Sequence, residues 1–151
     1  MIKNRSRLDE LLRLRLRKSR VPTVVDAWAK IGVSVSAVSA QRQATMVTRL
    51  RAAGFRSSPT LPPLSQEPLT RSVAEFAGSA DILAIIGWGV DEEPAVLLTV
   101  DALNRSVPNL RLIYPDGFVL IEQPTKSALI VDFDGDDRSA VYLDRLSLGD
   151  G

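Results

Sequence analysis

The second half of the chain is a series of short apolar runs separated by turn-forming residues. Each run is about as long as one β strand, and none approaches the roughly 18–20 apolar residues that a membrane span requires. Closely spaced runs of this length, with Gly, Pro or acidic residues between them, are typical of antiparallel sheets. We therefore expect an antiparallel β meander with one or two short helices, whose strands lie at residues 81–88, 95–100, 110–114, 118–122, 128–133 and 140–146.

The first part of the chain predicts helices instead. Residues 5–20 read RSRLDELLRLRLRKSR. At about 100° per residue, Leu8, Leu11, Leu12 and Leu16 fall within a stripe of about 140°, and arginines surround that stripe. This pattern favours an amphipathic and strongly basic helix.

A proline and a glycine mark the expected ends of the next elements. Pro22 should end the first helix, because a proline inside a helix removes a backbone hydrogen bond and clashes with the preceding turn. Thr23 would then cap a second helix that ends at Gly32, and a third helix would begin near Ser36 or Ser39.

Charge divides the chain into two regions. Residues 1–60 carry 13 Lys/Arg and 3 Asp/Glu, a net of +10, whereas residues 61–151 carry 6 Lys/Arg and 15 Asp/Glu, a net of −9. The sign changes within a segment rich in Pro and Ser, which is typical of a linker. The sequence thus predicts an α+β protein with a basic helical region at 1–56, a linker at 57–67 and an acidic α+β domain at 68–151.

Such a division of charge has two interpretations. The basic region would meet nucleic acid, a membrane surface or an acidic protein face. Alternatively, the two regions would attract each other, either within one chain or between the subunits of a homo-oligomer. We expect the partner to be nucleic acid or a basic protein such as a toxin, and we expect no membrane.

Two missing residue types narrow the possible chemistry. The chain has no Cys and no His. Disulfides, thiolate nucleophiles, Ser–His and Cys–His catalysis and His-ligated metals are therefore excluded. We predict that the protein is not an enzyme and uses no metal and no cofactor. The absence of Cys and of a secretory signal fits a cytoplasmic protein.

One segment of the basic region has a recognisable motif. Residues 23–39 read TVVDAWAKIGVSVSAVS and resemble the helix-turn-helix of lac-repressor-type bacterial regulators. The segment covers 17 of 151 residues and departs from the pattern at Trp28, where the family has a small residue, and it is followed by Ala40, where the family tends to have Arg. The matching positions are Thr23, Val24, Asp26, Gly32, Val33, Ser34, Val38 and Ser39.

This resemblance implies DNA binding in the major groove. Ser34 would cap the recognition helix, and the first residues of that helix would face the base edges. Arginines of the basic helix and of the following helix would contact phosphates. The candidate nucleic-acid-binding residues are Arg13, Arg17, Val35, Ser36, Ala37, Arg42 and Arg49.

The acidic stretch VDFDGDDR at residues 131–138 is predicted to form the tip of a hairpin. An EF-hand loop that began at Asp132 would need Gly at its sixth position and Glu at its twelfth, but those positions hold Asp137 and Leu143. A catalytic carboxylate pair would need a cleft that a hairpin tip does not provide. The loop would place Asp132 opposite either Arg138 or Ser139.

By composition, the acidic half is similar to small bacterial immunity proteins. That resemblance, which has no diagnostic motif, implies inhibition of a basic toxin through an acidic face. A structural or assembly protein with a basic arm is a third possibility. The candidate partner-binding residues are Asp91, Glu92, Glu93, Asp132, Asp134, Asp136 and Asp137.

Overall fold

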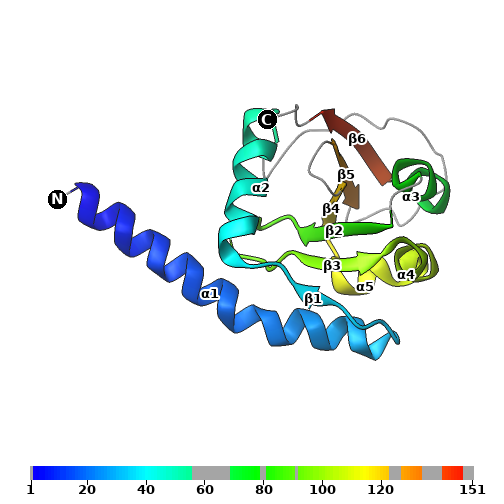
Figure 1. Cartoon of the computed structure of the whole chain (residues 1–151), viewed down its shortest axis with the longest axis horizontal. Coiled ribbons are helices and arrows are strands. Elements are labelled where there is room, and N and C mark those ends of the chain that lie inside the picture. The colour runs from blue at the N-terminus through cyan, green and yellow to red at the C-terminus, as the bar shows by residue number, and fades with distance from the viewer. Residues whose placement is uncertain are drawn as a thin grey trace.

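The computed structural model describes residues 2–55, 69–78, 81–90, 92–122, 127–133 and 141–147, with the backbone alone at 2–6, 70 and 141–147. The fold is α+β, as the sequence predicted (Figure 1). Its strands are β1 (Ser36–Ala37), β2 (Ile82–Gly87), β3 (Val96–Thr99), β4 (Gly117–Glu122), β5 (Ser127–Phe133) and β6 (Val141–Ser147). Its helices are α1 (Ile2–Lys30), α2 (Ala40–Ala52), α3 (Leu69–Ala77), α4 (Val100–Ser106), the 3-10 helix η1 (Val107–Asn109) and α5 (Leu110–Ile113).

The strands form one sheet in the order β1-β3-β2-β4-β5-β6, and every pairing is antiparallel. Strands β4, β5 and β6 form a meander as predicted, but β4 pairs with β2 and not with β3, so the meander does not run through all the expected strands. The prediction of a strand at residues 110–114 is wrong, because Leu110–Ile113 is a short helix that continues from η1. Pro108 lies at the start of η1, where its fixed φ angle favours a helical turn. Leu110 is buried, whereas Leu112 is 76% exposed.

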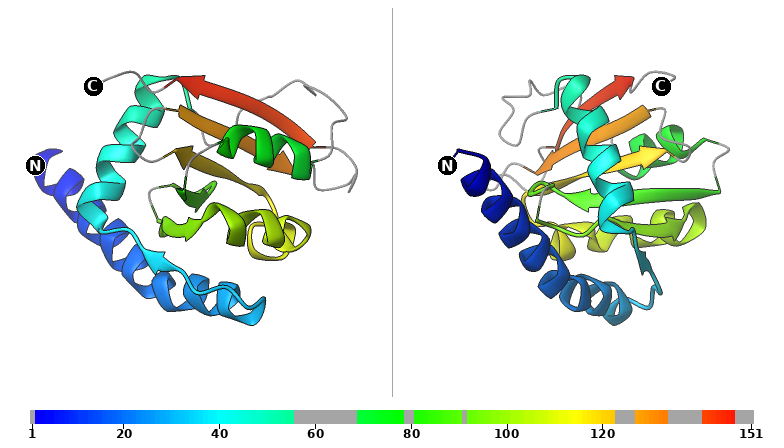
Figure 2. Two further views of the ribbon diagram at one scale, coloured as in Figure 1. Left: turned by 45° about the vertical axis from the view of Figure 1, so that its right-hand side comes forward. Right: turned by 60° about the vertical axis from the view of Figure 1, so that its left-hand side comes forward.

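The sheet is buried on both faces (Figure 2). Residues that alternate along a strand point to opposite faces, so Leu83 and Ile85 contribute to one core and Ala84 and Ile86 to the other. The α1-side core lies between the sheet and α1, α3, α4 and α5. The α2-side core lies between the other face and α2.

Helix α1 is longer than the sequence suggested, because it continues through Pro22 to Lys30. The expectations that Pro22 ends a helix and that Thr23 caps the next one are therefore wrong. An interior proline costs roughly 3 kcal/mol, and Pro22 lies on the exposed side of the helix. The turns that follow bury Val24 and Trp28, at about 1.5–3 kcal/mol for each large apolar side chain, which offsets that cost.

Helix α2 begins after Ser39, which is one of the two starting points that the sequence predicted. Ser39 is the N-cap, and its Oγ accepts a hydrogen bond from the backbone N–H of Arg42 at 3.2 Å. The buried side of the helix consists of Gln43, Met46, Val47 and Leu50.

The segment between α1 and α2 does not form a tight helix–helix turn. Residues 33–39 are extended, and Ser36 and Ala37 pair with Leu97 and Val96 of β3. Ser34 therefore caps no helix. The cause is the high content of β-branched valine in VSVSAV, which favours an extended backbone, together with the burial of Val33 and Val38 on opposite faces of the sheet.

The basic and acidic regions form one packed unit over the described residues. Trp28 of α1 lies in the α1-side core with Leu83 of β2, and Leu50 of α2 lies in the α2-side core with Ile86. The expected linker at 57–67 lies outside the described residues. Both cores therefore contain residues from the basic region and from the acidic region.

The pairing of β5 with β6 contradicts both predicted hairpin registers. Asp132 lies opposite Tyr142, and Phe133 lies opposite Val141. Within the described parts of the chain, no helix has the length and apolar character needed to cross a membrane.

Candidate binding surface on helices α1 and α2

The N-terminal half of α1 extends away from the rest of the molecule (Figures 1 and 2). It carries the leucine stripe, which we define as Leu8 (57% exposed), Leu11 (53%), Leu12 (47%) and Leu16 (44%). The buried residues of α1 are Arg17, Val24 and Trp28. At 3.6 residues per turn, the centre of the leucine stripe lies about 165° from the centre of these buried residues. The stripe therefore faces away from the body.

Basic side chains lie at one border of the leucine stripe and just inside it. Arg7, Arg15 and Lys18 are exposed, and they lie within about 80° of one another around the helix. We call these three residues the basic edge. The outward side of α1 thus combines an apolar stripe with a positive border, whereas Asp9 and Glu10 lie outside the basic edge.

Arg17 occupies a different place from the one predicted. It is 8% exposed, its Nε donates to Gln43 Oε1 at 2.7 Å, and its Nη2 donates to the carbonyl oxygen of Val38. Burial lowers the pKa of Arg17, because desolvation disfavours the charged form. The side chain joins α1 to α2 and is not part of an outer phosphate-binding face.

Gln43 completes this junction. Its Nε2 donates to the carbonyl oxygens of Val90 at 3.0 Å and Glu93 at 2.7 Å, and its Oε1 also accepts from the N–H of Ala95 at 2.9 Å. Every polar atom of this buried amide therefore has a partner. Nothing in the sequence indicated that Gln43 is a buried hydrogen-bonding residue, because a glutamine between arginine and alanine on a helix is expected to lie on the surface.

The other predicted nucleic-acid-binding residues do not form one surface. Arg42 and Arg49 share one flank of α2, about 170° from Arg51, which lies on the flank that faces α1. Arg13 of α1 lines the same groove as Arg51. The predicted arginines therefore divide into two groups on opposite flanks of α2.

Val35, Ser36 and Ala37 are also displaced from their predicted role. Ser36 and Ala37 form β1, and Val35 is half-buried against the α1-side core. These residues do not begin a recognition helix, because they add an edge strand to the sheet. Base contacts of the helix-turn-helix type are not available to them.

Two predicted partner-binding carboxylates contact the basic region of the same chain. Arg20 Nη1 lies 2.9 Å from Glu93 Oε1 and 3.9 Å from Glu92 Oε2. This pairing supports the interpretation that the two regions attract each other within one chain. Asp132 is half-buried on β5. Asp91, Asp134, Asp136 and Asp137 lie outside the described residues.

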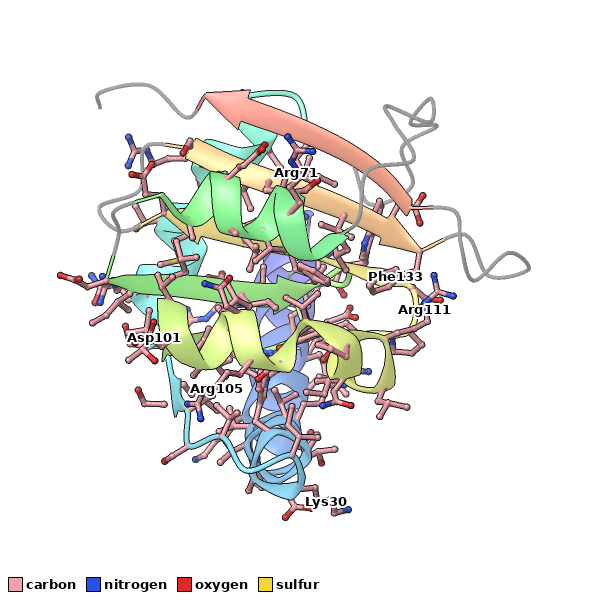
Figure 3. All side chains as sticks on the ribbon, turned by 90° about the vertical axis from the view of Figure 1, so that its right-hand side faces the viewer. Lys30, Arg71, Asp101, Arg105, Arg111 and Phe133 are labelled. Atoms are coloured by element: carbon pink, nitrogen blue, oxygen red, sulfur yellow. The ribbon has the colours of Figure 1, made fainter. Side chains whose placement is uncertain are left out.

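On the side of the molecule formed by α3, α4 and α5, the labelled side chains Arg71, Arg105 and Arg111 lie apart from one another (Figure 3). Arg71 pairs with Glu75 at 3.2 Å, and Arg105 Nε donates to the carbonyl oxygen of Asp101 at 3.4 Å. The Arg111 guanidinium lies 4.6 Å from the centre of the Phe133 ring, a cation–π contact. These contacts stabilise the surface locally.

Comparison with family models, with curated proteins and with solved structures finds no match to this chain. Within the described stretches, no three carboxylates gather in a way that could hold a metal ion.

Proposed function

We propose that this chain is a non-catalytic binding protein that presents helix α1 to an acidic protein partner. The observation that carries the proposal is the leucine stripe, whose four side chains are 44–57% exposed on a helix that extends from the body. Contiguous apolar side chains on a projecting element mark an interaction surface, because leaving them in water costs free energy. An amphipathic helix commonly binds by placing its apolar side in a groove of the partner.

The charge of α1 supports an acidic partner. Residues 7–20 carry six Lys/Arg and two Asp/Glu, a net of +4. Two copies of α1 would repel each other if their stripes paired, so a second copy of the chain is disfavoured. An acidic groove with an apolar floor would satisfy both the basic edge and the leucine stripe.

The proposal is tested by capturing partners from a lysate of the source cells on the immobilised chain. The double variant Leu8→Ala/Leu12→Ala should weaken partner binding by about 30-fold or more, because each leucine loses roughly 1–2 kcal/mol of burial. Stability should change by less than about 0.5 kcal/mol, since both side chains are exposed. Leu112→Ala, which removes an exposed leucine on α5, is the matched control and should retain the partner.

Nucleic-acid binding by α1 remains a second candidate, favoured by the alignment of Arg7, Arg15 and Lys18 in the basic edge. Such binding would weaken steeply with salt. A gel shift at low salt separates the two candidates. A complex that needs Arg7 and Arg15 but tolerates Leu8→Ala/Leu12→Ala would favour nucleic acid and would contradict a protein partner.

Inhibition of a basic toxin through the acidic face stays a prediction, as does a cytoplasmic location. Glu92 and Glu93 are already engaged by Arg20, which leaves them less available to a toxin. A toxin gene immediately upstream, with a product that binds this chain tightly, would favour that interpretation over ours.

A further inference from the structure

A groove of about 200 Å³ lies between α1 and α2. Figure 1 shows the two helices diverging from the point where α2 begins. The walls of the groove include Arg13 and Leu14 from α1 and Val47 and Arg51 from α2, and Arg17 also lines it. The groove lies on a different side of α1 from the leucine stripe, because Leu14 is about 135° from the centre of that stripe.

The guanidinium of Arg17 is held rigidly in this groove. Gln43 accepts from its Nε at 2.7 Å, and the carbonyl of Val38 accepts from its Nη2. Gln43 is itself held by hydrogen bonds with the backbone of Val90, Glu93 and Ala95. A charged group that is already oriented loses little conformational entropy when it binds a ligand.

The groove has more positive than negative charge. Three arginines (Arg13, Arg17 and Arg51) line it, against one carboxylate, Glu10. Among the described residues, no carboxylate forms an ion pair with Arg17. The N-terminal end of α2, whose first residue Ala40 also lines the groove, adds the positive end of the helix dipole. A buried positive charge without a counter-ion is costly, and an external anion would reduce that cost.

We propose that the groove between α1 and α2 binds a carboxylate side chain of an acidic peptide segment, with Arg13 and Arg51 as its wall contacts and Arg17 as a fixed charge. Leu14, which is 43% exposed, offers an apolar surface to the residue beside that carboxylate. An acidic peptide fits these features because it can place an apolar side chain against Leu14 next to the carboxylate, which an inorganic phosphate ion cannot do. The inference rests on the proposed function only in taking the partner to be an acidic protein.

The test uses the full chain and a fluorescein-labelled peptide made of Glu-Leu-Glu repeats, with binding followed by fluorescence anisotropy. Arg13→Gln and Arg51→Gln should each weaken binding by about tenfold, the value expected for losing one charge-assisted hydrogen bond. Arg42→Gln, on the opposite flank of α2, is the matched control and should bind as the unaltered chain does. A Gln-Leu-Gln peptide should bind at least about tenfold more weakly.

Three results would overturn the inference. The first is unchanged peptide affinity in both Arg13→Gln and Arg51→Gln. The second is an equal loss in Arg42→Gln, which would indicate diffuse attraction to the whole basic region. The third is tighter binding of a labelled single-stranded oligonucleotide through Arg13 and Arg51. Leu8→Ala/Leu12→Ala should leave peptide affinity unchanged. A failure of the role proposed for the leucine stripe can therefore be distinguished from a failure of the groove to bind the peptide.

Discussion

Tyr114 shows how one residue connects distant parts of the chain. The Nε1 of Trp28 donates to the Tyr114 hydroxyl at 3.2 Å, and the two ring centres lie 6.2 Å apart. Both side chains are buried. Burial raises the pKa of Tyr114 well above its ordinary value of 10.0, the hydrogen bond from Trp28 acts in the opposite direction, and the negative charge of Glu93 raises the pKa further. The folded state therefore keeps this phenol neutral.

Tyr114 should make the protein sensitive to alkaline pH. Its contribution to stability is fully present below pH 10.0, the ordinary pKa, and is lost as the pH rises above that value towards the higher folded pKa. We expect Tyr114→Phe to lose about 1 kcal/mol near neutral pH, because the hydrogen bond to Trp28 is removed, and to show a weaker decline above about pH 10. Urea unfolding of both proteins from about pH 7 to about pH 11.5 measures this. An identical alkaline decline in the two proteins would contradict it.

At the scale of one element, α1 has two functions along its length. Its C-terminal half packs Val24 and Trp28 into the α1-side core, and its N-terminal half presents the leucine stripe. Sequence periodicity identified the stripe, because the spacing of leucines is a local property. Periodicity did not identify Pro22 as an interior residue, because α1 is held on either side of Pro22 by contacts with distant segments: Arg17 with Gln43 of α2 on one side, and Trp28 with the α1-side core on the other.

Replacing Pro22 should therefore stabilise the protein. Pro22→Ala restores a backbone donor on the exposed side of α1, and we expect the free energy of unfolding to rise by about 1–3 kcal/mol. Urea denaturation measures the change. Thr23→Ala, at the exposed neighbouring position, should change stability by no more than about 0.7 kcal/mol. A loss of stability in Pro22→Ala would show that the proline sets a direction of α1 that the core requires.

At the scale of the whole molecule, the two charge regions make one folding unit. Leu50 and Met46 of α2 cover the face of the sheet that carries Ile86 and Ile121, and no other described helix contributes to the α2-side core. Arg20 and Glu93 pair across 73 positions of sequence. The charge difference between the regions therefore acts partly inside the molecule.

A fragment of residues 68–151 should not fold cooperatively. Without α2 and the second half of α1, both faces of the sheet would lose apolar cover, and the fragment should bind a hydrophobic dye and unfold without a sharp transition. Circular dichroism during heating, compared with the full chain, measures this. A sharp thermal transition in the fragment would restore the predicted division into separate domains.

The sequence by itself determined the features that depend on neighbouring residues. Alternating and continuous apolar runs indicated the strands, Ser39 marked the start of α2, and leucine spacing marked the exposed stripe of α1. These are local patterns of propensity, capping and periodicity, which need no knowledge of distant contacts.

Only the tertiary structure determined which charged side chains remain accessible to a partner. In the folded chain Arg17 is buried beside Gln43, Arg20 pairs with Glu93, and Ser36 and Ala37 form a strand. Each outcome depends on residues that lie far apart in sequence and meet only when the sheet and helices pack. The energy of a buried or paired arginine is set by those distant partners, so a list of arginines could not separate the structural ones from those that face a partner.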